Sequence, residues 1–230
     1  MKLIFICLFM FSIISKTENE LWDKANTLFK KSRYNESAKI LMEIEDLYPA
    51  SPRIKQVLFL ASKSFFLGKI YIKAIETAEL LKELDLQYSN DDVDEILIKS
   101  YYALLQRPER ENKNLNLIIN LSDKNPKKYN QIRQRCTDIL AYDSLATGLM
   151  YSKKGNHLVA LKYYGEIIKK YNTSNFTAEA YFRCAEIFHH LKLEKDANAC
   201  IKILSMKHKK SIWYANVLKL SLNNTKSNAS

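Results

Sequence analysis

Two runs of apolar residues at helical spacing, separated by Gly155 and Asn156, constrain the fold of this chain more than any other feature. Gly155 suits a left-handed helix cap, because only glycine adopts that conformation without a steric penalty at Cβ. Residues 142–171 therefore predict two antiparallel helices joined by a tight turn. The inner face of the first helix is predicted to carry Leu145, Ala146, Leu149 and Met150, and that of the second Ala160, Tyr164, Ile167 and Ile168.

A small residue near the start of the second helix of such a pair recurs along the chain. Ala160 lets the two helices approach closely, and the aromatic Tyr164 follows four residues later. A hairpin of this kind cannot bury its own apolar face, so it needs neighbours of the same kind. The pattern resembles the tetratricopeptide repeat of about 34 residues, and it predicts an all-α solenoid of about five helical hairpins. The small residues expected to pack at the helix crossings are Ser37, Ala74, Asn114, Ala160 and Ala197.

Composition and end segments define the expected domain organisation. The chain of 230 residues contains only four Gly and four Pro, which favours an all-helical protein. The solenoid is expected to span residues 17–222. An amphipathic segment that follows Ser211 is expected to be a C-terminal capping helix, because the ends of a solenoid need a cover. The polar residues 223–230 are expected to form a disordered tail.

The first sixteen residues have the layout of an export signal. Lys2 precedes an apolar run, and the chain becomes polar at Lys16, so the run is short for a membrane-spanning helix. Cys7 lies inside this run, whereas a bacterial lipoprotein signal places its cysteine at the end of the run. Residues 1–16 are therefore predicted to be an export signal without a lipid-anchoring cysteine.

The formal net charge of +11 comes mainly from lysine. Proteins that read nucleic acids favour arginine for two-pronged contacts to bases, and the few arginines here are dispersed along the chain. We therefore interpret the lysines as solvated helix faces and expect no nucleic-acid partner.

No catalytic, metal or cofactor constellation is found in the sequence. His189 and His190 are adjacent and would point about 100° apart on a helix, which makes a poor metal pair. The sequence contains no glycine-rich phosphate loop and no serine or cysteine beside a plausible base. Cys136, Cys184 and Cys200 lack zinc-site spacing and are interpreted as packed apolar residues. The chain is predicted not to be an enzyme and to bind no metal or cofactor.

The order of several short motifs from about residue 21 to residue 218 resembles the BamD family, the tetratricopeptide lipoproteins of the bacterial outer-membrane β-barrel assembly machinery. The motifs are Tyr48-Pro49, Ser51-Pro52, Gln56-Val57, the hairpin turn at Gly155, and Ser211 followed by Trp213-Tyr214.

This resemblance implies a peripheral scaffold in the periplasm, at the outer membrane of a Gram-negative bacterium. Its expected partners are a BamA-like insertase, other subunits of the assembly machinery, and unfolded outer-membrane proteins. The N-terminal repeats would meet unfolded substrates and the C-terminal repeats would dock the insertase. The residues assigned on this basis are Tyr48, Pro49, Arg53 and Phe66 for the substrate groove, and Lys162, Tyr163 and Glu166 for the insertase.

The sequence departs from the family at three points. Tyr163 stands where the family usually has an arginine that pairs with the insertase, and Arg53 stands where a tyrosine is common. The lipid-anchoring cysteine is absent, as described above. Two alternative functions therefore stay open: another exported repeat adaptor that coordinates peptidoglycan or division partners, and a secreted effector that acts on a host target.

Overall fold

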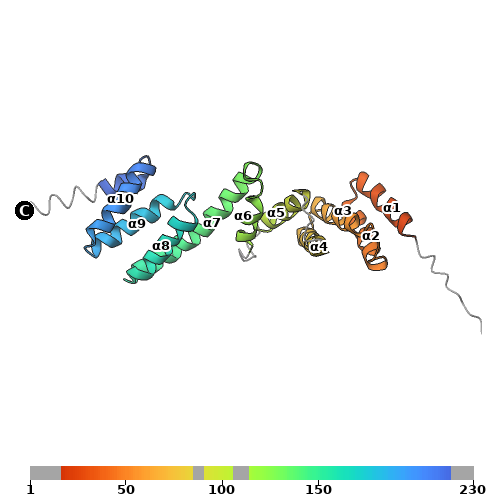
Figure 1. The fold of residues 1–230 in the computed structure, drawn as a ribbon, viewed down its shortest axis with the longest axis horizontal. Helices are drawn as coiled ribbons and strands as arrows, with labels where there is room; N and C mark the ends of the chain where they lie inside the picture. Colours follow the sequence, from red (N-terminus) through yellow and green to blue (C-terminus); the bar gives the residue numbers. More distant parts are fainter. Residues whose placement is uncertain (1–16, 85–90, 106–113, 219–230) are drawn as a thin grey trace, which may run out of the picture. The chain divides into compact units, whose positions relative to one another are not determined.

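The computed structural model describes residues 17–84, 91–105 and 114–218, and these residues form helices and turns without a β-strand (Figure 1). The prediction of an all-α fold is therefore confirmed. The predicted export signal and the predicted tail lie outside the described residues. The helices are α1 (Glu18–Lys30), α2 (Tyr34–Leu47), α3 (Ile54–Leu67), α4 (Tyr71–Leu84), α5 (Asp91–Leu105), α6 (Leu115–Ser122), α7 (Pro126–Lys153), α8 (His157–Lys170), α9 (Thr177–His190) and α10 (Glu194–Lys207).

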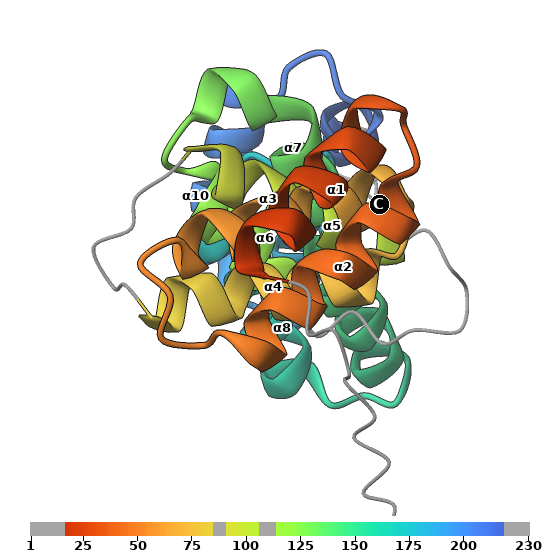
Figure 2. The ribbon, with the colours of Figure 1, turned by 90° about the vertical axis from the view of Figure 1, so that its right-hand side faces the viewer.

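The chain divides into two compact units, Met1–Glu111 and Asn112–Ser230. The first unit contains α1 to α5, and the second contains α6 to α10 together with the helical residues 212–218. Within each unit, helices that follow one another along the chain pack against each other, as α1 and α2 do in Figure 2. The pairs α1/α2, α3/α4, α7/α8 and α9/α10 are helical hairpins of the predicted kind.

All four of these hairpins turn in the same way. A residue with positive φ stands two positions after the first helix and two positions before the second. In the α7/α8 turn, the Gly155 amide donates to the Ser152 carbonyl at 3.0 Å and the Asn156 amide donates to the Tyr151 carbonyl at 2.9 Å. The same pair of bonds closes the other three turns and satisfies carbonyls at the helix end. The residues with positive φ are Ser32 (58°), Lys69 (61°), Gly155 (75°) and Lys192 (59°).

Small residues also occupy a constant place in each hairpin, on both of its helices. The Ser37 hydroxyl donates to the Ala25 carbonyl at 2.8 Å, across the crossing of α1 and α2. In the α7/α8 hairpin the Tyr164 ring covers Gly148 so closely that a Cβ there would lie 2.5 Å from a ring carbon. In each of these four hairpins the predicted small residue of the second helix is buried, and so is a small partner on the first helix. The pairs are Ala25 and Ser37, Ser62 and Ala74, Gly148 and Ala160, and Ala185 and Ala197.

Two details of the sequence prediction were wrong. Ala146 and Met150 are exposed, because the face of α7 that meets α8 contains Leu145 and Gly148 instead. Asn114 is an exposed residue at the N-terminal cap of α6, so it does not pack at a helix crossing.

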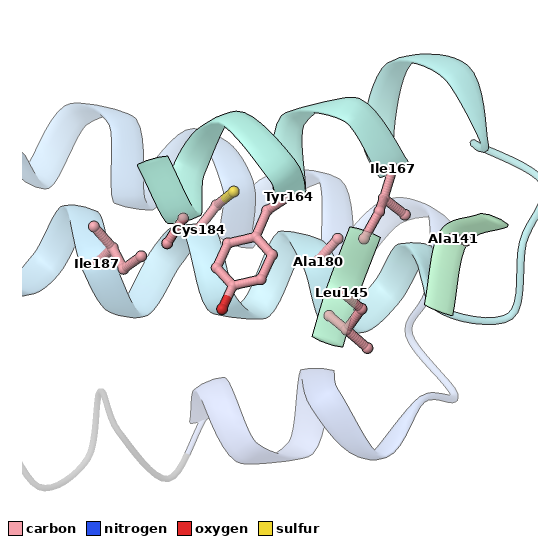
Figure 3. Packing of buried hydrophobic residues seen from close by; sticks show 8 residues of the cluster. Ala141, Leu145, Tyr164, Ile167, Ala180, Cys184 and Ile187 are labelled. Atoms are coloured by element: carbon pink, nitrogen blue, oxygen red, sulfur yellow. The ribbon is translucent and has the colours of Figure 1, made fainter. Parts of the chain in front are cut away.

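Each unit has its own apolar core. In the first, Leu21 and Ala25 of α1 pack with residues of α2 and α3. In the second, Tyr164 and Ile167 of α8 pack between α7 and α9 (Figure 3). The predicted C-terminal cap is present: Val217 is buried, and the Trp213 ring lies 5.2 Å from that of Phe182.

Candidate functional site

The residues predicted for the substrate groove fall at two ends of α3. Tyr48 and Pro49 follow α2, and Arg53 immediately precedes α3. Phe66 lies thirteen residues further along, about 20 Å away at the rise of an α-helix, where its ring is 6.1 Å from that of Tyr71. The structure therefore brings Tyr48, Pro49 and Arg53 into one region and leaves Phe66 in another.

Arg53 reaches from the start of α3 to the first turns of α1. One guanidinium nitrogen donates to Asn19 Oδ1 at 3.1 Å and lies 3.8 Å from a carboxylate oxygen of Glu18. The guanidinium also lies 5.3 Å from the centre of the Trp22 ring, within range of a cation–π interaction. Trp22 was not predicted as part of this region. The available signal was its position on α1, one turn after two polar residues.

The predicted insertase-facing residues all lie on α8. Lys162 is exposed, and the half-buried Tyr163 ring stacks on Tyr151 at 5.9 Å with an angle of 7° between the ring planes. Glu166 forms an ion pair with Lys170 at 2.8 Å. Because residues four apart are neighbours on a helix, Lys162 and Glu166 flank one another, and Tyr163 is held beside them by its stacking partner.

A hollow in the second unit was not predicted from the sequence. It lies between α7, the first residue of α8, and α9, and its volume is about 360 Å³. The available sequence signal for this hollow was the helical spacing of polar residues on the first helix of each hairpin. Solvated helix faces have the same spacing. The lining residues are Leu149, Ser152, Lys153, His157, Arg183, Glu186, Ile187 and His190.

Arg183, which lines this hollow, makes several contacts with charged and aromatic side chains. Its guanidinium forms ion pairs with Glu186 at 2.8 Å and Glu179 at 3.2 Å. It also lies 5.3 Å from the centre of the Phe182 ring and 5.2 Å from that of Trp213. The positive charge of Arg183 is therefore neutralised by two carboxylates, and its position is held by two rings.

Tyr164 of α8 is not among the residues that line the hollow, and it is fully buried, with 0% of its surface exposed. Figure 3 shows its ring projecting from α8 across α9, with the hydroxyl directed away from α8. Burial raises the pKa of Tyr164 to about 12, while the nearby Arg183 charge and Ser152 hydroxyl act in the opposite direction. The Tyr164 hydroxyl makes no hydrogen bond among the described residues.

His157, which lines the same hollow, also has one buried polar atom without a hydrogen-bond partner. Its Nδ1 is buried and accepts or donates no hydrogen bond within the described residues. Its ring meets the ring of His190 edge-on, with 5.0 Å between their centres.

A smaller hollow of about 270 Å³ in the second unit is lined by Arg133 and Lys170, among others. Both cations are already engaged, Arg133 with Asp123 at 2.6 Å and Lys170 with Glu166. Across the described parts of the chain, no group of three or more His, Cys, Asp or Glu side chains is placed to hold a metal ion. None of the described helices has the length and apolar character needed to cross a membrane.

The repeated hairpins, their constant turn and their small-residue crossings define a helical repeat protein of the tetratricopeptide type. No family model matches the chain. Its sequence is 22% identical over 215 residues to the outer membrane protein assembly factor BamD of Rickettsia prowazekii (strain Madrid E). The match covers 88% of this chain and 85% of that protein. The chain is thus a divergent BamD-like repeat protein, as the sequence motifs predicted.

A solved structure of a thermophilic tetratricopeptide-repeat protein of Thermus thermophilus is also similar. It is 17% identical, with a TM-score of 0.37, and the match covers 88% of this chain and 99% of that one.

Proposed function

We propose that this protein is a non-enzymatic scaffold that assists the assembly of β-barrel proteins at the outer membrane, by binding both an insertase and unfolded barrel substrates. The observation that carries the proposal is the similarity to an outer membrane protein assembly factor over 88% of the chain. The proposal also includes a periplasmic location at the outer membrane.

The structure supports a scaffold in two ways. Each unit consists of helical hairpins, the architecture that repeat proteins use to bind segments of other proteins. In addition, the protein has half-buried aromatic residues beside charged residues, such as Tyr163 beside Lys162. Aromatic residues of this kind contribute much of the binding energy of protein–protein interfaces.

The test is affinity purification of the intact protein from envelope membranes, with the partners identified by mass spectrometry. We expect recovery of a BamA-like insertase and of outer-membrane β-barrel proteins. Recovery of peptidoglycan or division proteins instead would support the adaptor alternative. Detection of the protein outside the producing cell would support a secreted effector.

The predicted insertase-facing residues can be tested in the same experiment. Tyr163→Ala is expected to reduce recovery of the insertase while the chain stays folded, because the substitution removes an aromatic surface at the edge of α8. Leu158→Ala is a suitable control, since Leu158 is on the same helix and is 77% exposed. Equal recovery with both variants would remove Tyr163 from the proposed interface.

A further inference from the structure

Two cysteines occupy matching positions on the two helices of the α9/α10 hairpin. Cys184 of α9 precedes Lys192, the turn residue with positive φ, by eight residues, and Cys200 of α10 follows it by eight. Because the helices are antiparallel, residues at equal distances from the turn lie at a similar height along the hairpin. In the other three hairpins these two positions are held by Lys24 and Ile40, Ala61 and Thr77, and Thr147 and Tyr163.

The two thiols are in contact. The Cys184 thiol donates a hydrogen bond to the Cys200 sulfur. Cys184 belongs to the apolar core of the second unit, where Figure 3 shows it on α9, and Cys200 packs against the same core. Ala185 and Ala197 are the buried small residues of this crossing, so the backbones of α9 and α10 approach closely beside the thiols. A disulfide needs sulfurs in contact on neighbouring backbones, and this hairpin has both features.

The two sulfurs differ in their access to solvent. Cys200 is partly exposed, whereas only 4% of the surface of Cys184 is exposed. Thiol–disulfide exchange begins with attack by a thiolate, so its rate depends on the thiolate fraction and on access. The hydrogen bond from Cys184 lowers the pKa of Cys200, and burial and the Asp196 charge oppose this effect. An external oxidant therefore reacts with Cys200 first, and Cys184 is placed to react second.

We propose that Cys184 and Cys200 form a disulfide that links α9 to α10 when the protein is exposed to an oxidant of the organic disulfide class. This modification site goes beyond the scaffold function and rests on it only for the compartment, because the periplasm is a place where disulfides persist. The bond would hold a helix with a small apolar anchor. The buried residues of α10 are Ala197 and Leu204, fewer than in any other helix of the four hairpins.

The reaction consists of two exchange steps. The Cys200 thiolate attacks one sulfur of the organic disulfide, the disulfide bond of the oxidant breaks, and the thiolate that leaves takes up the proton that Cys200 lost. Cys184 then loses its proton and attacks the Cys200 sulfur of the mixed disulfide, which displaces the second thiol of the oxidant. Two cysteine thiols are thereby oxidised to one disulfide, and the organic disulfide is reduced to two thiols.

The first experiment treats the reduced full-length protein with glutathione buffers of increasing oxidised fraction. Acid stops the exchange, free thiols are alkylated in denaturant, and the chain is digested with trypsin. Trypsin cleaves after Lys192 and Lys195, so the two cysteines fall in separate peptides. We expect these two peptides to be joined by a disulfide while Cys136 stays alkylated, because Cys136 is buried.

Three results of this experiment would overturn the proposal. The first is alkylation of both Cys184 and Cys200 at every glutathione ratio. The second is an exchange that stops with glutathione on Cys200, and the third is a bond between the Cys200 residues of two chains.

Single substitutions test the order of attack. Cys184→Ser should leave glutathione on Cys200, because the second step has no nucleophile. Cys200→Ser should leave Cys184 as a free thiol, because Cys184 is buried. Cys136→Ser is the matched control and should form the internal bond as the unmodified protein does. Glutathione on Cys184 in Cys200→Ser, at the rate seen for Cys200 in Cys184→Ser, would overturn the proposed order.

Thermal unfolding shows whether the bond fits the hairpin. The bond closes a loop of about 15 residues, so oxidation should raise the melting temperature of the second unit by roughly 10 °C. The same treatment should leave the melting temperature of Cys200→Ser unchanged. A lower melting temperature of the oxidised unmodified protein would show that the bond distorts the hairpin, and it would overturn the assignment.

The envelope purification separates this inference from the proposed function. Formation of the bond in the purified protein, without recovery of any assembly protein from membranes, would keep the disulfide and remove the scaffold function. Recovery of the insertase by a protein whose Cys184 and Cys200 stay free in oxidised glutathione would do the reverse.

Discussion

The Ser37 hydroxyl donates to the backbone carbonyl of Ala25 across the crossing of α1 and α2, at a distance of 2.8 Å. The hydroxyl fits there because both residues are small, and both are fully buried. The four hairpins of the described residues share this small-residue crossing, and the rest of each hairpin core is built around it. Substitutions that add volume at a crossing should therefore destabilise its unit, whereas the same substitutions away from a crossing should not.

Gly148→Ala and Gly165→Ala provide the matched comparison. Both glycines are in helix interiors, where alanine is normally favoured by about 0.5–1 kcal/mol. At Gly148 the new Cβ would lie 2.5 Å from the Tyr164 ring, so we expect a net loss of about 1–3 kcal/mol. At Gly165 no atom lies within 4 Å of the new Cβ, so we expect a gain.

Urea unfolding followed by circular dichroism measures both effects. Similar midpoints for the two variants would contradict the close packing of α7 and α8. Because the chain has two units, the transition of the second unit should be followed with a local probe such as Trp213 fluorescence, with Trp22 replaced by Phe in all the proteins compared.

The residues with positive φ in the hairpin turns lead to a second prediction, in which two substitutions change the free energy of unfolding in opposite directions. Lys69 and Lys192 adopt positive φ, which costs a residue with a Cβ roughly 1 kcal/mol. Lys192→Gly should therefore raise the free energy of unfolding by about 0.5–1 kcal/mol, and Gly155→Ala should lower it by about 1 kcal/mol. The loss at Gly155 would come from the backbone alone, since no atom lies within 4 Å of a Cβ placed there.

Thermal unfolding of the two variants beside Lys195→Gly checks this prediction. Lys195 is in the first turn of α10, where glycine is expected to destabilise. A lower melting temperature for Lys192→Gly would show that the Lys192 side chain contributes a contact that outweighs the backbone cost.

Much of the fold was predictable from the sequence because hairpin repeats depend on local features. Gly155, the spacing of Ala160 and Tyr164, and the copies of that pattern are sufficient to predict the helices and their pairing. The face of α7 was predicted less well: Met150 and Ala146 were assigned inward on apolar character, but the Tyr164 ring needs the space above Gly148. A glycine carries no apolar signal, so its role at the crossing is evident only when the opposing ring is placed.

The hollow beside Tyr164 could not be predicted, since it depends on how side chains from three helices meet. Ser152, His157 and Arg183 are separated along the chain, and each alone has the pattern of a solvated helix residue. Arg53 illustrates the same limit in the first unit. Its position near Tyr48 was predictable, but its contacts with Asn19 and Trp22 of α1 depend on the packing of three helices.

Tyr164→Phe should stabilise the protein at neutral pH, because the substitution removes a buried hydroxyl that has no partner. The expected gain is about 1 kcal/mol. Burial raises the pKa of Tyr164 to about 12 from an ordinary value near 10. A raised pKa means that the folded state holds the proton more tightly than the unfolded state does. The resulting proton-linked contribution to the free energy of unfolding is present below pH 10 and is lost as the pH rises toward 12.

The free energy of unfolding of the unmodified protein should therefore fall more steeply than that of Tyr164→Phe between pH 10 and pH 12. The difference should reach about 2–3 kcal/mol at the upper end. Tyr171→Phe is a useful comparison, because burial also raises the pKa of Tyr171 but its ring is only half-buried. Parallel pH profiles for the unmodified protein and Tyr164→Phe would contradict the burial of the Tyr164 hydroxyl.

The cysteines of the second unit should differ in reactivity toward iodoacetamide. The thiolate is the reactive form of cysteine, and a hydrogen bond from the Cys184 thiol holds the pKa of Cys200 below its ordinary value. The same interaction and burial raise the pKa of Cys184, and burial raises that of Cys136 to about 11. Cys200 is also partly exposed, whereas the other two are buried.

Alkylation at pH 7.5, resolved by peptide mass spectrometry, should therefore modify Cys200 well before Cys184 or Cys136. Cys184→Ala distinguishes the hydrogen bond from simple exposure. If the thiol of Cys184 lowers the pKa of Cys200, its removal should slow alkylation of Cys200, although the smaller alanine leaves Cys200 at least as accessible. An unchanged or faster rate in Cys184→Ala would show that exposure alone determines the reactivity of Cys200.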